Sequence, residues 1–172
     1  MDHIDRLIKD ISEASKALNF EYNRLKTEIN TMPQWMYLAL FEYEMGHKEI
    51  PGPEENEEIL KYHKYTENIP AESEEVPWCA AFVNWVLEKS GFRTPRSGLA
   101  RSYLNFGEPC KHNGSLGSVC VFQRGSKPWM GHVGFLLDQS DDQILLLSGN
   151  MSNTITREWF PKKKLLQYRW PK

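Results

Sequence analysis

Apolar residues recur at three- and four-residue steps over residues 3 to 30, with charged and polar residues between them. This spacing predicts an amphipathic helix. Four of its apolar residues keep a seven-residue step: Ile4, Ile11, Leu18 and Leu25. Glu21 and Glu28 occupy the companion row, so the pattern does not support a long coiled coil. The helix is expected to pack on its own domain, and docking on a partner or a second copy is the alternative.

Further helices are predicted before residue 91. Pro33 stands in the first turn of a helix that Gly46 ends. A short acidic helix is expected at residues 55–65, followed by an irregular polar loop at residues 66–77. Residues 77–90 form the next predicted helix, which Gly91 closes.

Short β-type runs replace the helical pattern after Gly117. The expected strands are residues 118–123, 132–138, 144–148 and 165–170. The polar residues 139–144 predict a hairpin between the second and third of these strands. Helices followed by an antiparallel meander predict an α+β domain.

Composition and charge narrow the class of protein. With 40% hydrophobic and 26% charged residues, the 172-residue chain predicts one globular domain plus an added element. A formal net charge of -2 provides no basic face for nucleic acid, and residues 162–164 form a basic run too short to supply one. No run of 18 or more apolar residues predicts a membrane span.

Three cysteines, Cys79, Cys110 and Cys120, are an odd number without CxxC spacing. A disulfide framework and a zinc knuckle are therefore both poor interpretations. The pair Cys110 and His112 has no further ligands at sensible spacing, and no calcium loop surrounds Asp138. Neither a metal nor a cofactor is expected, so a single reactive thiol becomes the feature to seek.

Cys79 lies in the first turn of the helix predicted at residues 77–90. Unpaired amides and the peptide dipoles at a helix N-terminus stabilise a thiolate, which is the nucleophilic form of cysteine. The alternative is a buried cysteine that acts as a small hydrophobic residue.

His132 opens a predicted strand just after a loop that contains Trp129, and it is the expected base for the thiol. A third polar group should hold its imidazole in the productive tautomer. If the hairpin turns near residues 141–142, Asn150 returns to the strand end where His132 begins. A shift in register would transfer this role to Ser148 or Asn153.

Three sequence blocks resemble the cysteine, histidine and polar-residue motifs of CHAP and NlpC-like peptidoglycan hydrolases. They are residues 77–85 (PWCAAFVNW), 131–135 (GHVGF) and 148–153 (SGNMSN). Residues 49–53 (EIPGP) and 168–171 (YRWP) are similar to a small branch of that superfamily found in phage and bacterial genomes. The resemblance runs from about residue 35 to residue 171 and excludes the N-terminal helix.

The resemblance implies a papain-like domain at residues 32–172, with residues 1–31 as an added amphipathic helix. It also implies that Cys79 attacks an amide carbonyl, that His132 acts as base and then acid, and that Asn150 orients His132. Trp78, Trp129 and Ser148 are predicted to contact the substrate. Relatives commonly have Pro-Gly-Asp where this chain has LGSV at residues 116–119, which is expected to alter a turn and not the chemistry.

The expected function is cleavage of an amide bond in the peptidoglycan stem peptide, by an amidase or an endopeptidase. The alternatives are a non-catalytic module that binds wall fragments or a partner, and an acyltransferase in which an amine resolves the thioester. The start of the chain lacks the features of a signal peptide. Delivery from the cytoplasm to the wall by lysis, a phage particle or a secretion system is therefore expected, and an inhibitor or delivery protein is a possible partner.

Overall fold

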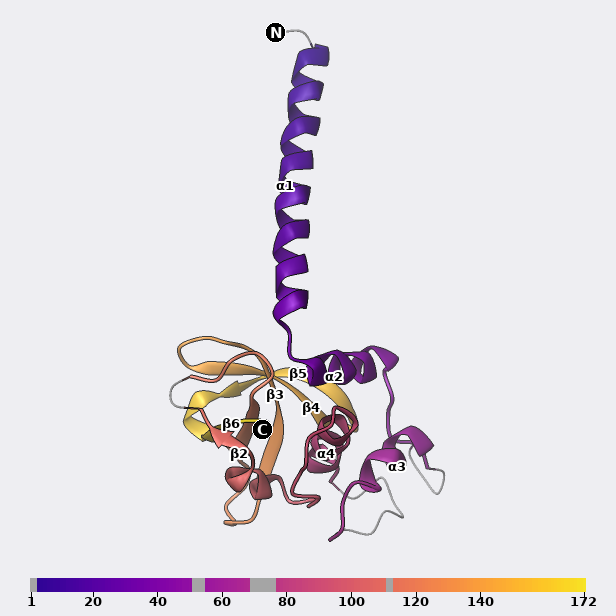
Figure 1. The fold of residues 1–172 in the computed structure, drawn as a ribbon, viewed down its shortest axis with the longest axis vertical. Coiled ribbons are helices and arrows are strands. Elements are labelled where there is room, and N and C mark those ends of the chain that lie inside the picture. Colours follow the sequence, from indigo (N-terminus) through magenta and orange to yellow (C-terminus); the bar gives the residue numbers. More distant parts are fainter. Residues whose placement is uncertain (1–2, 51–54, 69–76, 111–112) are drawn as a thin grey trace. The chain divides into compact units, whose positions relative to one another are not determined.

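The computed structural model describes residues 3–50, 55–68, 77–110 and 113–172 (Figure 1). The chain divides into two compact units, Met1–Met32 and Pro33–Lys172. Among the described residues, no helix has both the length and the apolar character that crossing a bilayer requires.

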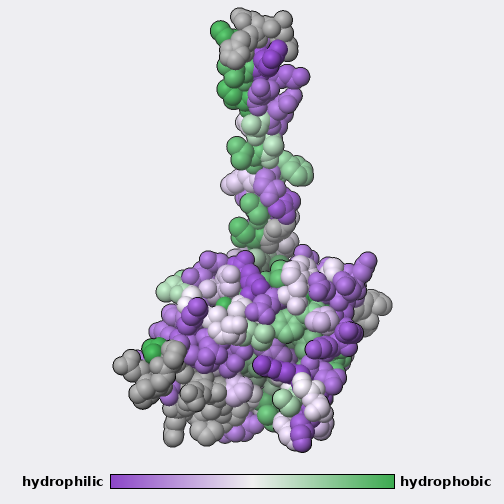
Figure 2. Space-filling view, turned by 180° about the vertical axis from the view of Figure 1, so that it is seen from behind, coloured by the Kyte–Doolittle hydropathy of each residue, from purple (hydrophilic) through white to green (hydrophobic). Residues whose placement is uncertain are grey.

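The first unit is the helix α1, His3–Thr31. Its large apolar side chains are all exposed, from 45% at Leu25 to 72% at Leu18 and Phe20. Hydrophobic and hydrophilic surfaces lie side by side along this helix in Figure 2. The predicted amphipathic helix is therefore present.

The second unit begins with the helices α2 (Gln34–Met45), α3 (Glu57–His63) and α4 (Cys79–Lys89). Pro33 caps the start of α2, and Gly46 ends it in the left-handed conformation with φ 68°. The Asn56 side chain accepts a hydrogen bond from the Glu58 amide and thereby caps α3. Most of the loop predicted after α3 lies at residues 69–76, outside the described residues.

Six strands form one sheet in the order β1-β6-β2-β3-β4-β5, with all neighbours antiparallel. The strands are β1 (Glu108–Pro109), β2 (Val119–Gln123), β3 (Gly131–Gln139), β4 (Gln143–Met151), β5 (Thr154–Pro161) and β6 (Leu165–Trp170). Short 3₁₀ helices, η1 (Ala100–Asn105) and η2 (Lys162–Lys164), precede β1 and β6. The predicted hairpin joins β3 to β4. Helices followed by this sheet confirm the α+β class.

Helix α4 packs against β3 and β4 (Figure 1). Residues 79–87 of α4 are all buried, and the Phe82 and Phe135 rings meet at a centroid distance of 6.3 Å. A Cβ atom at Gly149 would lie 2.3 Å from the ring of Trp78. The absence of a side chain at Gly149 therefore lets the start of α4 approach β4.

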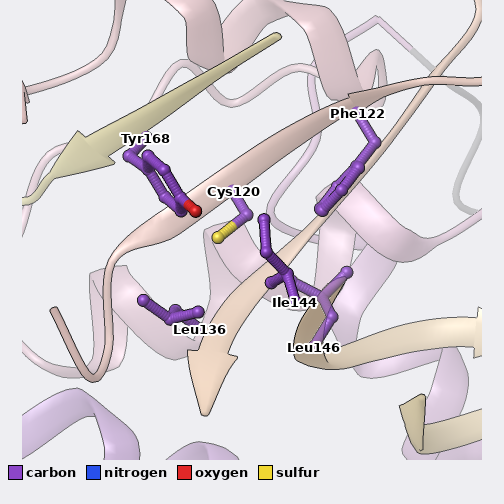
Figure 3. Close-up of a cluster of buried hydrophobic side chains, with 6 residues drawn as sticks. All are labelled: Cys120, Phe122, Leu136, Ile144, Leu146 and Tyr168. Atoms are coloured by element: carbon purple, nitrogen blue, oxygen red, sulfur yellow. The ribbon is translucent and has the colours of Figure 1, made fainter. Parts of the chain in front are cut away.

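A hydrophobic cluster links four strands, β2, β3, β4 and β6 (Figure 3). Its buried members are Cys120, Phe122, Leu136, Ile144, Leu146 and Tyr168. Leu136 follows Phe135 along β3, and successive strand side chains point to opposite faces. This cluster therefore lies on the sheet face opposite α4.

Candidate functional site

Cys79 is the first residue of α4, directly after the N-cap residue Trp78. Its side chain is only 4% exposed, yet it lines a cavity of about 410 Å³. Most of the cavity wall is apolar or small, and it comprises Pro77, Gly98, Leu99, Ala100, Arg124, Trp129, Met130, Gly131 and Asn150. The predicted helix start is confirmed, and its thiol faces a cavity that could hold a substrate group.

Burial raises the pKa of the Cys79 thiol above its usual value. Backbone hydrogen bonding with Val133 and Ala80 and the positive charge of Arg124 act in the opposite direction, but burial dominates. The helix N-terminus alone was expected to favour the thiolate. In this structure burial instead disfavours the thiolate and shifts the pKa in the opposite direction.

His132 lies near the start of β3 and is 2% exposed. Its Nε2 atom forms a 2.8 Å hydrogen bond with Oγ of Ser148 on β4. Its ring also stacks on Phe160 of β5, with a centroid distance of 5.4 Å. Nδ1 has no hydrogen-bond partner among the described residues. If Nε2 carries the ring proton and donates it to Ser148, Nδ1 is the nitrogen that can accept a proton.

Burial lowers the pKa of His132 to about 4, and the Arg124 charge adds to this effect. Ser148 supplies no negative charge that would raise it. The imidazole is therefore neutral at pH 7, which is the form required of a base.

In the structure Ser148 contacts His132, whereas Asn150 contacts Trp78. Oriented with its oxygen toward Trp78, the Asn150 amide accepts hydrogen bonds from the Trp78 backbone N at 3.0 Å and from its indole N at 3.2 Å. The predicted contact between Asn150 and His132 assumed regular hairpin pairing. However, β4 leaves the extended conformation at Asn150, where φ is 58°, so its side chain does not follow the pleat.

Gly134 makes room for the contact between Ser148 and His132. A Cβ atom at this position would lie 2.7 Å from Cβ of Ser148 and 2.5 Å from the Leu147 carbonyl oxygen. The absence of a side chain at Gly134 thus allows β4 to approach β3 closely beside this contact.

No described contact joins Cys79 to His132, and the alternation along β3 directs the His132 side chain to the sheet face of Leu136, opposite α4. The backbone of Val133, the residue after His132, interacts with the Cys79 thiol. His132 lines a second cavity of about 150 Å³, and Arg124 lines both cavities. Proton transfer between them would require the His132 ring and the Cys79 thiol to meet when substrate binds, as catalytic contacts that form only in the substrate complex do.

The two tryptophans predicted to contact substrate occupy different environments. Trp129 is 57% exposed and lines the Cys79 cavity, where its ring can form a substrate wall. Trp78 is fully buried, and its indole N donates to Glu49 at 2.6 Å. Its ring packs under Gly149 and positions the helix start, so it offers no face to a substrate. Ser148 is also fully buried and reaches His132 instead.

Within the part of the chain that the structure describes, one group of side chains has metal-ligand chemistry, namely Glu42, His47 and Glu58. Lys61 contacts both carboxylates, at 2.9 Å from Glu42 and 2.5 Å from Glu58. The Lys61 ammonium already pairs with both carboxylates, so the group is explained as an ion-pair cluster between α2 and α3.

A thiol at the start of a helix, with a buried histidine on the strand against which that helix packs, defines a candidate cysteine hydrolase site. Residues 71–150 match the family model of the CHAP domain. The match includes all four residues of this site and confirms the resemblance to the CHAP and NlpC-like family. CHAP domains are generally cysteine- and histidine-dependent amidohydrolases or peptidases, which indicates peptidoglycan hydrolysis in broad terms. A comparison with curated proteins found no match.

Proposed function

We propose that this protein is a papain-like cysteine hydrolase that cleaves an amide bond of the peptidoglycan stem peptide. The observation that carries the proposal is the Cys79 thiol in its cavity together with a buried histidine on β3, the strand against which α4 packs. A thiol begins α4, and a buried neutral imidazole on β3 has Nδ1 available and Nε2 held by Ser148. The CHAP match supports the substrate class.

In the proposed reaction, Nδ1 of His132 takes the proton of the Cys79 thiol as Sγ attacks the amide carbonyl carbon. The tetrahedral intermediate collapses when the C–N bond breaks and His132 returns the proton to the leaving amine. Water then attacks the thioester, loses a proton to His132, and releases the acid product and the free thiol. The Cys79 backbone N–H is one donor for the developing oxyanion.

Ser148, in this proposal, is the orienting residue, and Asn150 positions the nucleophile. The Ser148 hydroxyl fixes the tautomer of His132 by accepting from Nε2. Asn150 accepts from the backbone N–H at the N-cap of α4 and so holds the residue that precedes Cys79. Neither Ser148 nor Asn150 carries a negative charge that would stabilise a protonated imidazole. In this proposal His132 therefore takes the proton of Cys79 only when the thiol attacks a bound substrate.

The site of action in this proposal is the cell wall, reached from the cytoplasm by lysis, a phage particle or a secretion system. An inhibitor or delivery protein would then be a partner. The exposed Trp129 ring beside the Cys79 cavity suits packing against the sugar or the alkyl part of a muropeptide.

Purified sacculi provide the decisive test. They are incubated with the protein and with Cys79→Ala, and the released muropeptides are identified by mass spectrometry. We expect new amine and carboxyl termini at one stem-peptide bond with the native protein and none with the variant. Release by both proteins, or by neither, would reject the proposed hydrolysis, and binding of sacculi without release would favour the non-catalytic module.

A further inference from the structure

Arg124 is a charged side chain common to both cavities of the site. It follows the last residue of β2, is exposed, and lines the Cys79 cavity as well as the His132 cavity. Its charge influences both Cys79 and His132, which places the guanidinium close to each. Arg124 thus lies beside the position where a bound carbonyl group would be attacked.

The described lining of the two cavities contains no carboxylate. Apart from Arg124 and the neutral His132, the titratable side chains there are Cys79 and Lys164. Arg124 itself has no hydrogen bond or ion pair with any described residue. A chain with net charge -2 therefore presents positive charge and no described negative charge at this site.

We propose that Arg124 binds a carboxylate of the substrate next to the bond that Cys79 attacks. A guanidinium offers paired N–H donors that match the two oxygens of a carboxylate, and this geometry also fixes orientation. The reaction partner would be an acidic peptide, with the free acid preferred over its carboxamide. This inference names the substrate chemistry of the proposed hydrolase, but its test does not require hydrolysis.

Two alkylating reagents of nearly equal size distinguish attraction by the Arg124 charge from simple access to the Cys79 thiol. Iodoacetate carries a carboxylate and iodoacetamide does not, so the ratio of their rates at Cys79 reports attraction of the anion. We expect Arg124→Gln to lower this ratio by roughly tenfold, as loss of a charged hydrogen-bonding partner predicts. Because Arg124 is exposed, the substitution leaves the buried core unchanged.

Arg93→Gln is the matched control, because it removes the same charge from a cavity that does not include Cys79. An equal drop with Arg93→Gln, or an unchanged ratio with Arg124→Gln, would overturn the carboxylate site. So would failure of both reagents to reach Cys79 in the native protein. A normal ratio shift together with intact sacculi would reject the hydrolase and retain the anion site.

A second inference concerns α1 and rests on the full heptad pattern of its exposed residues. Two rows, offset by three and four residues, alternate along the helix: Ile4, Ile11, Leu18 and Leu25 in one, and Ile8, Ser15, Tyr22 and Ile29 in the other. Seven of these eight residues are large and apolar, with exposures from 45% to 72%. Glu21 lies beside these two rows and not within them.

The charges that flank these rows suit a second copy of the same helix. With Ile8 at heptad position a and Ile4 at position d, Glu21 takes position g and Lys26 position e. In a parallel pair, g of one helix faces e of the next heptad in its partner, so Glu21 meets Lys26 of the other copy. This pairing of g and e positions places no two residues of like charge opposite each other. We propose that α1 assembles the protein through a parallel coiled coil with copies of itself.

Sedimentation equilibrium of the full chain tests this assembly. Leu18→Glu and Phe20→Glu introduce the same charge at two side chains that are both 72% exposed, but only Leu18 lies in the apolar rows. We expect an oligomer for the native protein and for Phe20→Glu, and a monomer for Leu18→Glu. A monomeric native protein at millimolar concentration, or dissociation by Phe20→Glu alone, would overturn the proposal.

Charge exchange checks the parallel orientation. Glu21→Lys should weaken the assembly, and Glu21→Lys combined with Lys26→Glu should restore it, since the facing pair regains opposite charges. Failure of the double variant to restore assembly would contradict the parallel arrangement.

Discussion

At the scale of single residues, the positions of Cys79 and His132 in the fold were predictable because each stands at the start of an element that its sequence marks clearly. The third group was harder to predict, since it depends on the backbone conformation of one residue. Asn150 has φ 58°, and an Asn in a strand pattern does not reveal whether it will adopt the left-handed region. Ser148, a register alternative, is the residue that contacts His132.

Ser148→Ala should lower kcat more than Asn150→Gly does. Loss of the hydroxyl leaves Nε2 of a buried imidazole without a partner and releases the tautomer, whereas glycine at position 150 keeps the backbone conformation and loses only the cap. We expect a loss of about 10- to 100-fold for Ser148→Ala. Steady-state kinetics on a stem-peptide substrate provide the measurement, with KM nearly unchanged.

Asn150→Ala is informative beside Asn150→Gly, because alanine adds strain at a positive φ. If Asn150→Gly proves more damaging than Ser148→Ala in folded protein, Asn150 has a direct role in catalysis and Ser148 is not the orienting residue.

The reactivity of Cys79 should continue to rise with pH beyond the range of ordinary thiols. Burial raises its pKa, so the thiolate fraction increases only at high pH. Cys120 is fully buried away from the described cavities, and burial raises its pKa as well. Alkylation by iodoacetamide from pH 7 to pH 10, followed by peptide mapping, should therefore show Cys79 reacting faster than Cys120. Equal rates in the folded protein would contradict access through the Cys79 cavity.

At the scale of elements, helix caps and turns explain which predictions hold. Pro33, Gly46 and Gly91 mark helix ends that the chain uses, and the hairpin between β3 and β4 follows from polar residues between two apolar runs. β5 was not predicted, because it is an edge strand in which polar residues alternate with partly buried ones. Its pattern indicates a strand only after β4 is known to need a neighbour.

Close packing of α4 on β4 predicts a large effect at Gly149. A methyl group there would meet the buried Trp78 ring at 2.3 Å, so Gly149→Ala must displace either β4 or the helix start. We expect a loss of about 1–3 kcal/mol in the free energy of unfolding, the usual cost of overpacking a core. Urea denaturation measures it, and the Cys79 alkylation rate should change at the same time. A variant with native stability and native alkylation would show that this contact does not position Cys79.

Removal of residues 1–30 should leave the unit Pro33–Lys172 intact. The helix belongs to a separate unit, the site residues all come from α4, β3, β4 and their loops, and the CHAP match begins at residue 71. The truncated protein is expected to retain Cys79 alkylation and hydrolysis of soluble muropeptides. If it folds, as judged by circular dichroism, but loses both activities, the helix forms part of the active site.

At the scale of the whole molecule, protonation of His132 makes the stability of the folded protein depend on pH. Its pKa in the folded protein is about 4, while that of an unfolded chain is 6.5. Between these values the unfolded state binds a proton that the folded state does not, so stability is full above pH 6.5 and falls as pH decreases toward 4. The contribution is at most about 1.4 kcal/mol per pH unit.

Urea titrations at several pH values should reveal this slope in the native protein and a smaller slope in His132→Gln. Identical slopes for the two proteins would mean that the imidazole is not held neutral by the fold. The same low pKa predicts that hydrolysis stays active well below pH 6, because a neutral His132 is the required base.

The protonated state of Cys79 also bears on survival in an oxidising medium. Peroxide reacts with thiolates far faster than with thiols, so a nucleophile that ionises only during attack on its substrate resists conversion to sulfenic acid. An enzyme that works outside a reducing cell would keep its activity there without a protective disulfide. Inactivation by hydrogen peroxide should accordingly be slow at pH 7 and accelerate above pH 9, whereas rapid loss at pH 7 would indicate that the thiolate is already present.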